Sequence, residues 1–519
     1  METLEFILHG VDAPSGTYLA WESAQCPPAF AVLERPRLVE VTQALARALP
    51  DYIDDDGAAA PSQSFDDAFP PLAAPSRRSG ARVDHRPLEA GLSSEDTNRF
   101  LRVAHGPFLS PEDELRLMSD VADAVLPEDF VRSVLEAAGD GSRRVLVVLN
   151  APPSCGQVPW ELLPTGRQTA DGHAERLLDV VDVVTMGAIL SRDADPTVAH
   201  PSWENVKDAP ALYLIQPWNP ATSGPGVLSG SSLRQWDQRV SNRGPLGLAP
   251  DRRRERADRI WLSSALRRDE SVAAPGNNRP LSHLLYVGHM TGDGMSSRLQ
   301  LADDAEVFGR TPLDTAGCRW FSADDLVHGT WKWGEYAAHQ QYQHRETGAR
   351  IDIGTRWPTG VGVAQEADSV TPFDVPEEKH GLILWPMPPR VGLVACQSGT
   401  EPRQLEPFGM VTAILEAGAE LVMATRWTML TDRFFQQVSQ DPDVRPFFDL
   451  SVVVDECLQA EDPVREMNEW KRARLRRWRD EPTTAGSPLT WAGLTAFRAP
   501  DRSVPVSRAG AVDDDERAH

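Results

Sequence analysis

The sequence predicts an α/β protein whose mostly parallel sheet is flanked by helices. Apolar runs rich in β-branched residues recur along the chain, as expected for strands that are buried on both faces. Helical segments separate these runs, and such alternation is typical of a parallel sheet covered on both sides. With 519 residues, 41% of them hydrophobic, the chain is long enough for about three domains and a sizeable core. The expected strands lie at residues 144–150, 211–216, 284–289, 391–396 and 420–425.

The composition argues against several classes of function. Asp and Glu number 76 against 52 Lys and Arg, giving a net charge of −24, so direct nucleic-acid binding is not expected. The five cysteines are odd in number and widely spaced, and we therefore expect no disulfide framework, no metal site and no other cofactor. Residues 1–10 do not resemble a signal peptide, and no stretch reaches the roughly 18 apolar residues of a membrane helix. These features favour a cytoplasmic protein without membrane contact.

Three segments are expected before the main domain. Residues 1–50 are interpreted as a small α/β segment, with a strand at 3–8 and a helix at 38–48. Residues 51–85 are rich in Asp, Ala, Ser and Pro and lack periodicity, which predicts a flexible, disordered linker. Residues 86–142 are interpreted as a helical region.

One helix start in that region has a clear sequence signal. Ser110 is an expected N-cap, and Pro111 follows it at the first helical position. The next three residues, 112–114, are acidic, and the helix dipole favours negative charge in the first turn.

The main domain is expected at residues 143–498, followed by a disordered acidic tail at 499–519. Helices are expected at 252–268 and 405–417, and one long helix at 450–480. The long helix closes with the basic segment KRARLRRWR, which is more typical of a solvated helix face than of a nucleic-acid site.

Two of the expected strands end in residues with catalytic potential, His289 and Cys396. Ligands in open parallel sheets bind beyond the carboxyl ends of the strands, so an imidazole and a thiol on neighbouring strands would share one cleft. That pairing is the arrangement for nucleophilic catalysis by cysteine. The alternative is that the thiol is a small buried hydrophobe and the histidine is structural. Cys155, in the Pro-rich loop PPSCGQVPWE, is a rival nucleophile.

A series of motifs then resembles the CHAT domain, a family of caspase- and separase-like cysteine peptidases. In that family a strand ending in His-Gly precedes a turn, a strand ending in Ser-Ala-Cys, a helix ending in AGA, and a Trp. The resemblance covers roughly residues 143–498 and implies a caspase-like fold with a dyad of His289 and Cys396. The matching pieces here are VPWELL (158–163), LLYVGHM, FSADDLVHG (321–329), VGLVACQSGT, GMVTAILEAGAELVMATRW and SPLTWAGLTAF (487–497).

The chain departs from the family pattern at two places. The resemblance implies an oxyanion hole made by the backbone N–H groups of Cys396 and of the residue after the histidine, which is Gly in the family and Met290 here. Met tolerates a positive φ poorly, so a hole that required one would be strained. The second departure is an insert at about 330–390, interpreted either as a substrate platform or lid or as a surface decoration.

Specificity is predicted from Asp432. In the separase branch a similar Trp-x-x-T-D segment supplies an Asp that binds the Arg side chain before the scissile bond, but this chain has one extra residue between Trp427 and the Thr. The alternative is that Thr431 or Asp432 caps the helix that begins RFFQQV. The acid that metacaspases carry two residues before the Cys is replaced by Val394. Glu161 is expected to anchor a loop through hydrogen bonds.

The resemblance therefore implies a cysteine endopeptidase that cleaves a protein substrate after Arg or Lys. Family members are often regulated effectors in bacterial defence or cell death, so a sensor or regulatory protein partner is expected. Two alternatives stay open. One is an inactive CHAT-like scaffold that binds partner proteins, which Met290 favours; the other is an amidase or acyltransferase that acts on a small molecule.

Overall fold

The computed structural model describes fourteen stretches of the chain, and all structural statements below concern these residues. They are 3–50, 102–139, 143–187, 201–217, 226–250, 257–267, 280–291, 297–303, 320–329, 341–344, 350–352, 370–372, 381–396 and 409–500. The expected linker at 51–85 and nearly all of the expected tail lie outside them.

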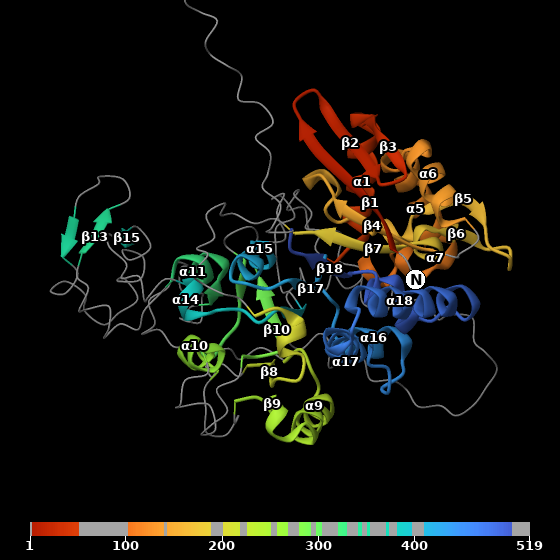
Figure 1. Ribbon diagram of the computed structural model, residues 1–519. Helices are drawn as coiled ribbons and strands as arrows, with labels where there is room; N and C mark the ends of the chain where they lie inside the picture. The colour runs from red at the N-terminus through yellow and green to blue at the C-terminus, as the bar shows by residue number, and fades with distance from the viewer. Residues whose placement is uncertain are drawn as a thin grey trace, which may run out of the picture.

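A 13-stranded sheet forms the centre of the molecule (Figure 1). Its main path is β9-β8-β10-β16-β17-β18-β7-β4-β1-β2-β3, and β11 and β12 extend it beside the end of β10. The strands are β1 Thr3–Ala13, β2 Gly16–Ser23, β3 Cys26–Leu33, β4 Arg144–Asn150, β7 Asp182–Met186, β8 Ala211–Ile215, β9 Gly247–Leu248, β10 His283–Thr291, β11 Arg298–Leu299, β12 Phe321–Ser322, β16 Arg390–Cys396, β17 Leu421–Thr425 and β18 Leu494–Arg498.

The sheet consists of two parallel halves that run in opposite directions. β8, β9, β10, β16 and β17 are parallel to one another, and we call them the C-half. β1, β4, β7 and β18 are also mutually parallel, and we call them the N-half. β17 and β18 meet antiparallel at the junction. The carboxyl ends of the two halves therefore lie at opposite edges of the sheet.

Helices cover both faces of the C-half (Figure 1). α9 (Gly230–Asn242) and α17 (Pro446–Gln459) pack on one face, whose buried residues continue into the N-half as a single cluster. α18 (Pro463–Asp480) packs beside α17 and against β7 of the N-half. α10 (Arg259–Arg267), α11 (Ala323–His328), α14 (Gly381–Leu384) and α15 (Gly409–Glu416) cover the other face. α16 (Asp432–Ser439) precedes α17, and α1 (Arg35–Ala48), α5 (Pro111–Val125) and α6 (Glu128–Ala138) pack beside the N-half.

Short elements complete the described structure. They are η1 Pro107–Leu109, η2 Pro153–Cys155, η3 Trp160–Leu162, β5 Pro164–Gln168, β6 Ala174–Arg176, α7 Leu177–Val180, α8 Trp203–Val206, η4 Gly244–Leu246, η7 Thr484–Gly486 and α19 Pro488–Trp491, with a separate small sheet of β13 Gln341–His344, β14 Arg350–Asp352 and β15 Val370–Pro372. That small sheet and residues 381–390, which include α14, are the described parts of the expected insert at 330–390.

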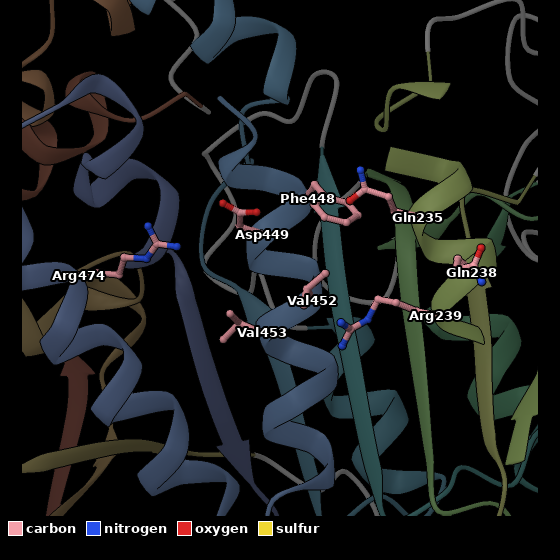
Figure 2. Close-up of a pocket in the computed structure, with 8 residues that line it drawn as sticks. All are labelled: Gln235, Gln238, Arg239, Phe448, Asp449, Val452, Val453 and Arg474. Carbon is pink, nitrogen blue, oxygen red and sulfur yellow. The ribbon is translucent and has the colours of Figure 1, made fainter. Parts of the chain in front are cut away.

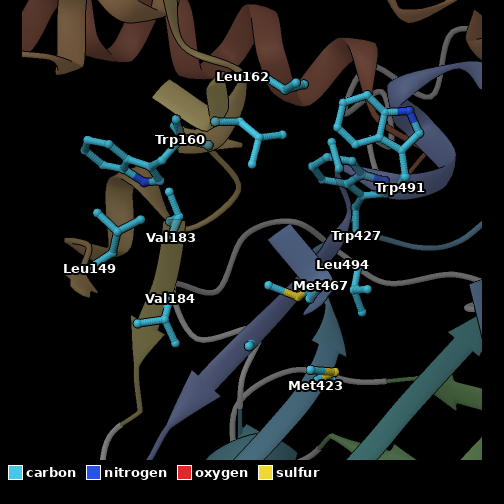
Figure 3. Packing of buried hydrophobic residues seen from close by; sticks show 14 of the residues in the cluster. Leu149, Trp160, Leu162, Val183, Val184, Met423, Trp427, Met467, Trp491 and Leu494 are labelled. Atoms are coloured by element: carbon cyan, nitrogen blue, oxygen red, sulfur yellow. The ribbon is translucent and has the colours of Figure 1, made fainter. Parts of the chain in front are cut away.

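The larger hydrophobic cluster crosses the junction between the halves (Figure 3). Trp160 and Val183 come from the N-half, Met423 comes from the C-half, and the rings of Trp427 and Trp491 lie near the point where β17 and β18 meet. Burial of one large aromatic or aliphatic side chain typically stabilises a fold by about 1.5–3 kcal/mol. A shared cluster of this kind binds the two halves into one structure.

The structure confirms the predicted α/β class, and the expected strands correspond to β1, β4, β8, β10, β16 and β17; β9 was not expected. Ser110 caps α5 as expected, because its side chain accepts a hydrogen bond from the Asp113 N–H. β1 pairs with β4 inside the main sheet, so the sheet is continuous across the expected boundary at residue 143. The proposed division into domains stays a prediction.

One expectation about the last helices is wrong, and another holds only in part. The segment 450–480 is not one helix but α17 and α18, because Pro463 cannot continue a helix and Asp462 caps a new one. The basic segment is a solvated face only in part. Arg476 and Arg477 are exposed, but Lys471 is buried against Glu161, and Arg472 and Arg479 bind carbonyl and carboxylate oxygens around α7.

Candidate functional site

The strands that end at His289 and Cys396 are parallel neighbours, as predicted. His289 on β10 is paired directly with Cys396 on β16, and this is the last pair of their ladder. Adjacent strands lie about 5 Å apart, so the backbones of the two residues are in close reach of each other. The His289 side chain is partly exposed. At Cys396 the structure describes the backbone, so the thiol itself lies outside the description.

The backbone at Met290 is extended. Met290 continues β10 and is paired with Leu299 of β11, and it is not among the described residues with a positive φ. The strain that a positive φ would cause at this position is therefore absent. The Gln300 N–H donates to the His289 carbonyl, which makes Met290 and Leu299 a pair without mutual hydrogen bonds. The Met290 N–H accordingly faces away from β11 and toward β16.

α17 is oriented by a buried polar cluster at its carboxyl-terminal half. The Tyr213 hydroxyl donates to Asp455 at 2.9 Å, and His283, the first residue of β10, lies 3.4 Å from the same carboxylate oxygen. The Arg390 side chain, at the start of β16, donates to carbonyls just beyond α17. Burial tends to raise the pKa of Asp455, but the contact with His283 and the Arg243 charge hold it below its usual range. α17 therefore runs opposite to β10 and β16, and its first turn points to their carboxyl ends.

Asp432 binds this first turn of α17. Its Oδ1 accepts hydrogen bonds from the backbone N–H groups of Phe447, at 2.8 Å, and Phe448, at 3.3 Å. The residue is only 3% exposed, and burial raises the pKa of its carboxyl to about 6. Its Oδ2 is buried and has no hydrogen-bond partner among the described residues. Asp432 is the first residue of α16, but its side chain stabilises the next helix, α17. Thr431 occupies the N-cap position of α16 and makes no capping hydrogen bond with its side chain.

The level of Asp432 along the sheet follows from element geometry. Asp455 lies beside His283, and α17 rises about 12 Å from there to Phe447. β10 rises about 20 Å from His283 to His289. Asp432 therefore lies at the same end of the sheet as His289, roughly 8 Å short of its level. Alternation along β10 puts His289 on the α17 face too, with Leu285 and Val287.

Glu161 is an anchor at the junction, as expected. Its carboxylate accepts from Arg426 at 2.7 Å and from Lys471 at 2.5 Å, and all three side chains are buried. Burial alone would raise the pKa of Glu161, but the charges of Arg426 and Lys471 lower it. Burial lowers the pKa of Lys471 to about 8. Arg426 also donates to Thr495, so the cluster ties the loop after β4 to β17, α18 and β18.

Sequence reasoning did not identify the partner of the aspartate in the motif FSADDL. Asp325 caps its own helix with Ser322 and also binds Arg259, whose guanidinium lies 3.3 Å from Asp325 and 2.9 Å from Asp303. All of these side chains are fully buried. This cluster supports β11 and β12 beside the end of β10. The Ser-x-x-Asp spacing signalled the cap, but nothing local signalled Arg259.

The structure describes the thiols of Cys26, Cys155 and Cys457. Cys155 and Cys457 are buried, and burial raises the pKa of each to about 12. A thiol with a raised pKa carries little thiolate and is a poor nucleophile. Cys26 is partly exposed on β3, at the far edge of the N-half. Cys318 lies outside the described residues.

A groove with a volume of about 450 Å³ lies over α17, between α9 and α18 (Figure 2). Phe448, Val452 and Val453 form its apolar floor, and Arg239 and Arg474 reach in from the flanking helices. None of the predicted site residues lines it. Within the described ranges we find no cluster of three or more potential metal ligands and no helix that is both long and apolar enough to cross a bilayer.

Comparisons with known proteins return structures but no family. No family model and no curated protein matches the chain. The chain is similar to the separase of Saccharomyces cerevisiae in two crystal structures of its complex with securin, at 3.0 and 2.6 Å resolution. The TM-scores are 0.39 and 0.38, with 9% sequence identity. Each alignment covers 96% of this chain but 30% of the separase chain, so this chain spans under a third of that protein.

The class of protein follows from the sheet itself. A 13-stranded, mostly parallel sheet with helices on both faces defines an α/β protein.

Proposed function

We propose that the chain is a cysteine endopeptidase that uses His289 and Cys396 as a catalytic dyad. The observation that carries the proposal is the direct pairing of these residues at the carboxyl ends of parallel neighbours. Ligands in α/β sheets bind at this edge. A Cys and a His that form one residue pair of a ladder are placed for nucleophilic catalysis. Structural roles for the two residues would not require them to be paired at the ends of their strands.

In this reaction the His289 imidazole takes the proton of the Cys396 thiol and stabilises the thiolate. The thiolate attacks the scissile carbonyl carbon, and the tetrahedral intermediate collapses as the imidazolium gives its proton to the leaving amine. The imidazole then removes a proton from water, and the resulting hydroxide attacks the thioester. This step releases the carboxylate product and restores the thiol.

The Met290 N–H is one donor of the oxyanion hole, and the Cys396 N–H is the other. Support comes from the orientation of the Met290 peptide, whose N–H faces β16. The ladder between β10 and β16 extends through the pair of His289 and Cys396. We use the term last rung for the pair of His289 and Cys396. A substrate carbonyl reaches the two N–H groups when the ends of β10 and β16 separate at this rung. The spacing of the two strand ends can therefore control activity.

Cleavage follows Arg, or less readily Lys, and Asp432 binds the basic side chain. Asp432 lies on the α17 face at the same end of the sheet as His289, roughly 8 Å short of its level. Its Oδ2 has no partner among the described residues. A carboxylate can pair with a guanidinium through two parallel hydrogen bonds but offers Lys one point contact.

The peptidase acts in the cytoplasm as a regulated effector in a bacterial defence or cell-death system, and a protein partner controls it. The similar separase structures hold that enzyme together with securin. In this chain, a protein partner that moves the ends of β10 and β16 apart or together would control access to the dyad.

A biotinylated Arg acyloxymethylketone tests the activity. We expect the wild-type protein to be labelled at Cys396, the Cys396→Ala variant to be silent, and the Cys155→Ala variant to be labelled like the wild type. Labelling of Cys155, or loss of labelling in Cys155→Ala, would refute the dyad.

The second candidate is an inactive scaffold that binds partner proteins. Met290 in place of the family glycine and the ladder that runs through the last pair favour it. A scaffold predicts no labelling at any concentration of the reagent.

A further inference from the structure

A buried phenol lies directly beneath the last rung. Tyr286 is fully buried on the face of β10 opposite to α17. Its hydroxyl donates to the His289 carbonyl oxygen at 2.6 Å and lies 3.1 Å from the Gln300 carbonyl. The same His289 oxygen accepts the Gln300 N–H at 3.0 Å. Two donors therefore hold one carbonyl oxygen.

That carbonyl belongs to the peptide group whose other end is the Met290 N–H. A trans peptide is planar, and its C=O and N–H point in opposite directions. Fixing the His289 oxygen on the β11 side therefore fixes the Met290 N–H on the β16 side. Hydrogen bonds to the oxygen also polarise the group and strengthen the N–H as a donor.

Gly288 makes this contact possible. A Cβ at residue 288 would lie 2.6 Å from the Tyr286 hydroxyl, closer than carbon and oxygen can approach without a shift. Burial also raises the pKa of Tyr286, so the phenol stays protonated and remains a donor at any ordinary pH.

We propose that Tyr286 is a positioning residue that orients and polarises the His289–Met290 peptide as a donor of the oxyanion hole. The inference rests on the proposed peptidase function, since it assigns a further part of that site. Tyr286 does not touch substrate; it acts through the peptide group that does.

The first experiment measures the peptide group without any reaction. His289–Met290 is the single His-Met step in the sequence, so labelling His with ¹³C at the carbonyl and Met with ¹⁵N gives one coupled NMR signal. We expect Tyr286→Phe to move the His289 carbonyl and Met290 nitrogen signals upfield, because the carbonyl loses a donor. Gly288→Ala, which displaces the hydroxyl from the other side, should move them in the same direction.

The matched control is Tyr213→Phe, which removes a buried phenol from the neighbouring strand. The Tyr213 hydroxyl binds Asp455 rather than the end of β10, so the signal should stay in place. An unchanged signal in both Tyr286→Phe and Gly288→Ala would overturn the proposal.

The second experiment distinguishes an effect on the oxyanion hole from an effect on the nucleophile Cys396. An Arg peptide aldehyde forms a hemithioacetal whose oxygen occupies the hole, whereas iodoacetamide alkylates a thiolate without one. We expect Tyr286→Phe to weaken aldehyde inhibition by up to about fivefold, because the Met290 N–H is weakened as a donor and one ordinary hydrogen bond is the upper limit of that loss. The rate of Cys396 alkylation should stay unchanged. A merely structural role would change both or neither.

The outcomes distinguish the two proposals. If wild-type Cys396 reacts with neither reagent, the peptidase proposal fails and this inference fails with it. If the wild type reacts with both and Tyr286→Phe binds the aldehyde equally well, the peptidase proposal stands and the role of Tyr286 is refuted.

Discussion

The two halves of the sheet end their ladders in a similar way but with different chemistry. In the C-half, the last pair of β10 and β16 is His289 and Cys396. In the N-half, the last pair of β1 and β4 is His9 and Asn150, and the Asn150 amide lies 3.1 Å from the His9 ring nitrogen. Each half thus sets an imidazole beside the end of a parallel neighbour. An amide cannot serve as a nucleophile, so of these two edges only the one with Cys396 carries the residue types that the proposed dyad needs.

The largest expected effect tests this difference directly. Cys396→Ala and His289→Ala should each lower peptide cleavage by about a thousandfold or more, because nucleophile and base act as a unit. His9→Ala and Asn150→Ala are matched substitutions at the other edge and should leave cleavage unchanged. Cleavage rates and melting curves of the four variants decide the matter. Equal loss from both pairs would mean that the two edges are not functionally distinct.

A second prediction concerns the cluster that joins the halves. Glu161→Gln removes the carboxylate that neutralises the buried Arg426 and Lys471, and we expect the free energy of unfolding to fall by about 3–5 kcal/mol. Glu469→Gln breaks an exposed pair with Arg465 and should change stability little. Denaturant unfolding followed by Trp fluorescence measures both. Separate transitions for the two halves in Glu161→Gln would show that this cluster makes them fold as one.

A third prediction concerns Asp432, which belongs to the C-half alone. Asn keeps the cap on α17 but loses the charge, so Asp432→Asn should lower kcat/KM for Arg substrates about tenfold, or ~1.4 kcal/mol. Alkylation of Cys396 by a neutral reagent should stay the same. A pure capping role predicts no change in residue preference. Peptide-library profiles of wild type and variant distinguish these roles, and a wild-type preference for Asp or an apolar residue would exclude Asp432 from the site.

The raised pKa of Asp432 adds a pH dependence. The folded carboxyl has a pKa of about 6 against an ordinary value of 3.8, so the folded state binds this proton more tightly. Stability from this residue is therefore present at low pH and is lost as the pH rises from about 4 to about 6. Asp432→Asn should flatten that part of the stability profile. The preference of the enzyme for Arg substrates should depend on pH in the opposite way. It should weaken below about pH 6, where the Asp432 carboxyl is protonated.

The smallest expected effect concerns the thiol of the N-half. Cys155→Ala removes one buried sulfur whose pKa is raised to about 12, and we expect unchanged cleavage and a loss of about 1 kcal/mol in stability. The same substitution at Cys457 in α17 is the control. An activity loss confined to Cys155→Ala would assign the nucleophile to the wrong half.

The sequence predicted the C-half well because its signals are local. Apolar runs and the polar residues after them locate β10 and β16. The chemistry at the two strand ends and the resemblance to the CHAT domain, not sequence order, predicted that these strands are neighbours. The sequence did not predict that the N-half strands run opposite to the C-half strands. That direction depends on β18 pairing antiparallel with β17 and parallel with β7. The burial of Lys471 was missed for a similar reason, because its partner Glu161 is 310 residues away in the sequence. The break between α17 and α18 was predictable from Asp462 and Pro463.

The place of β18 has a consequence for synthesis. β18 is the last strand along the described chain, yet it lies in the middle of the sheet, between β17 and β7. Until a ribosome has made Leu494–Arg498, the edges of β17 and β7 both lack a neighbour, and the two halves cannot close on each other. Unpaired edges of this kind invite aggregation, and pairing over long sequence distances is slow. The two halves of the sheet are therefore joined to each other only after Leu494–Arg498 has been made, although β10 and β16 can pair earlier.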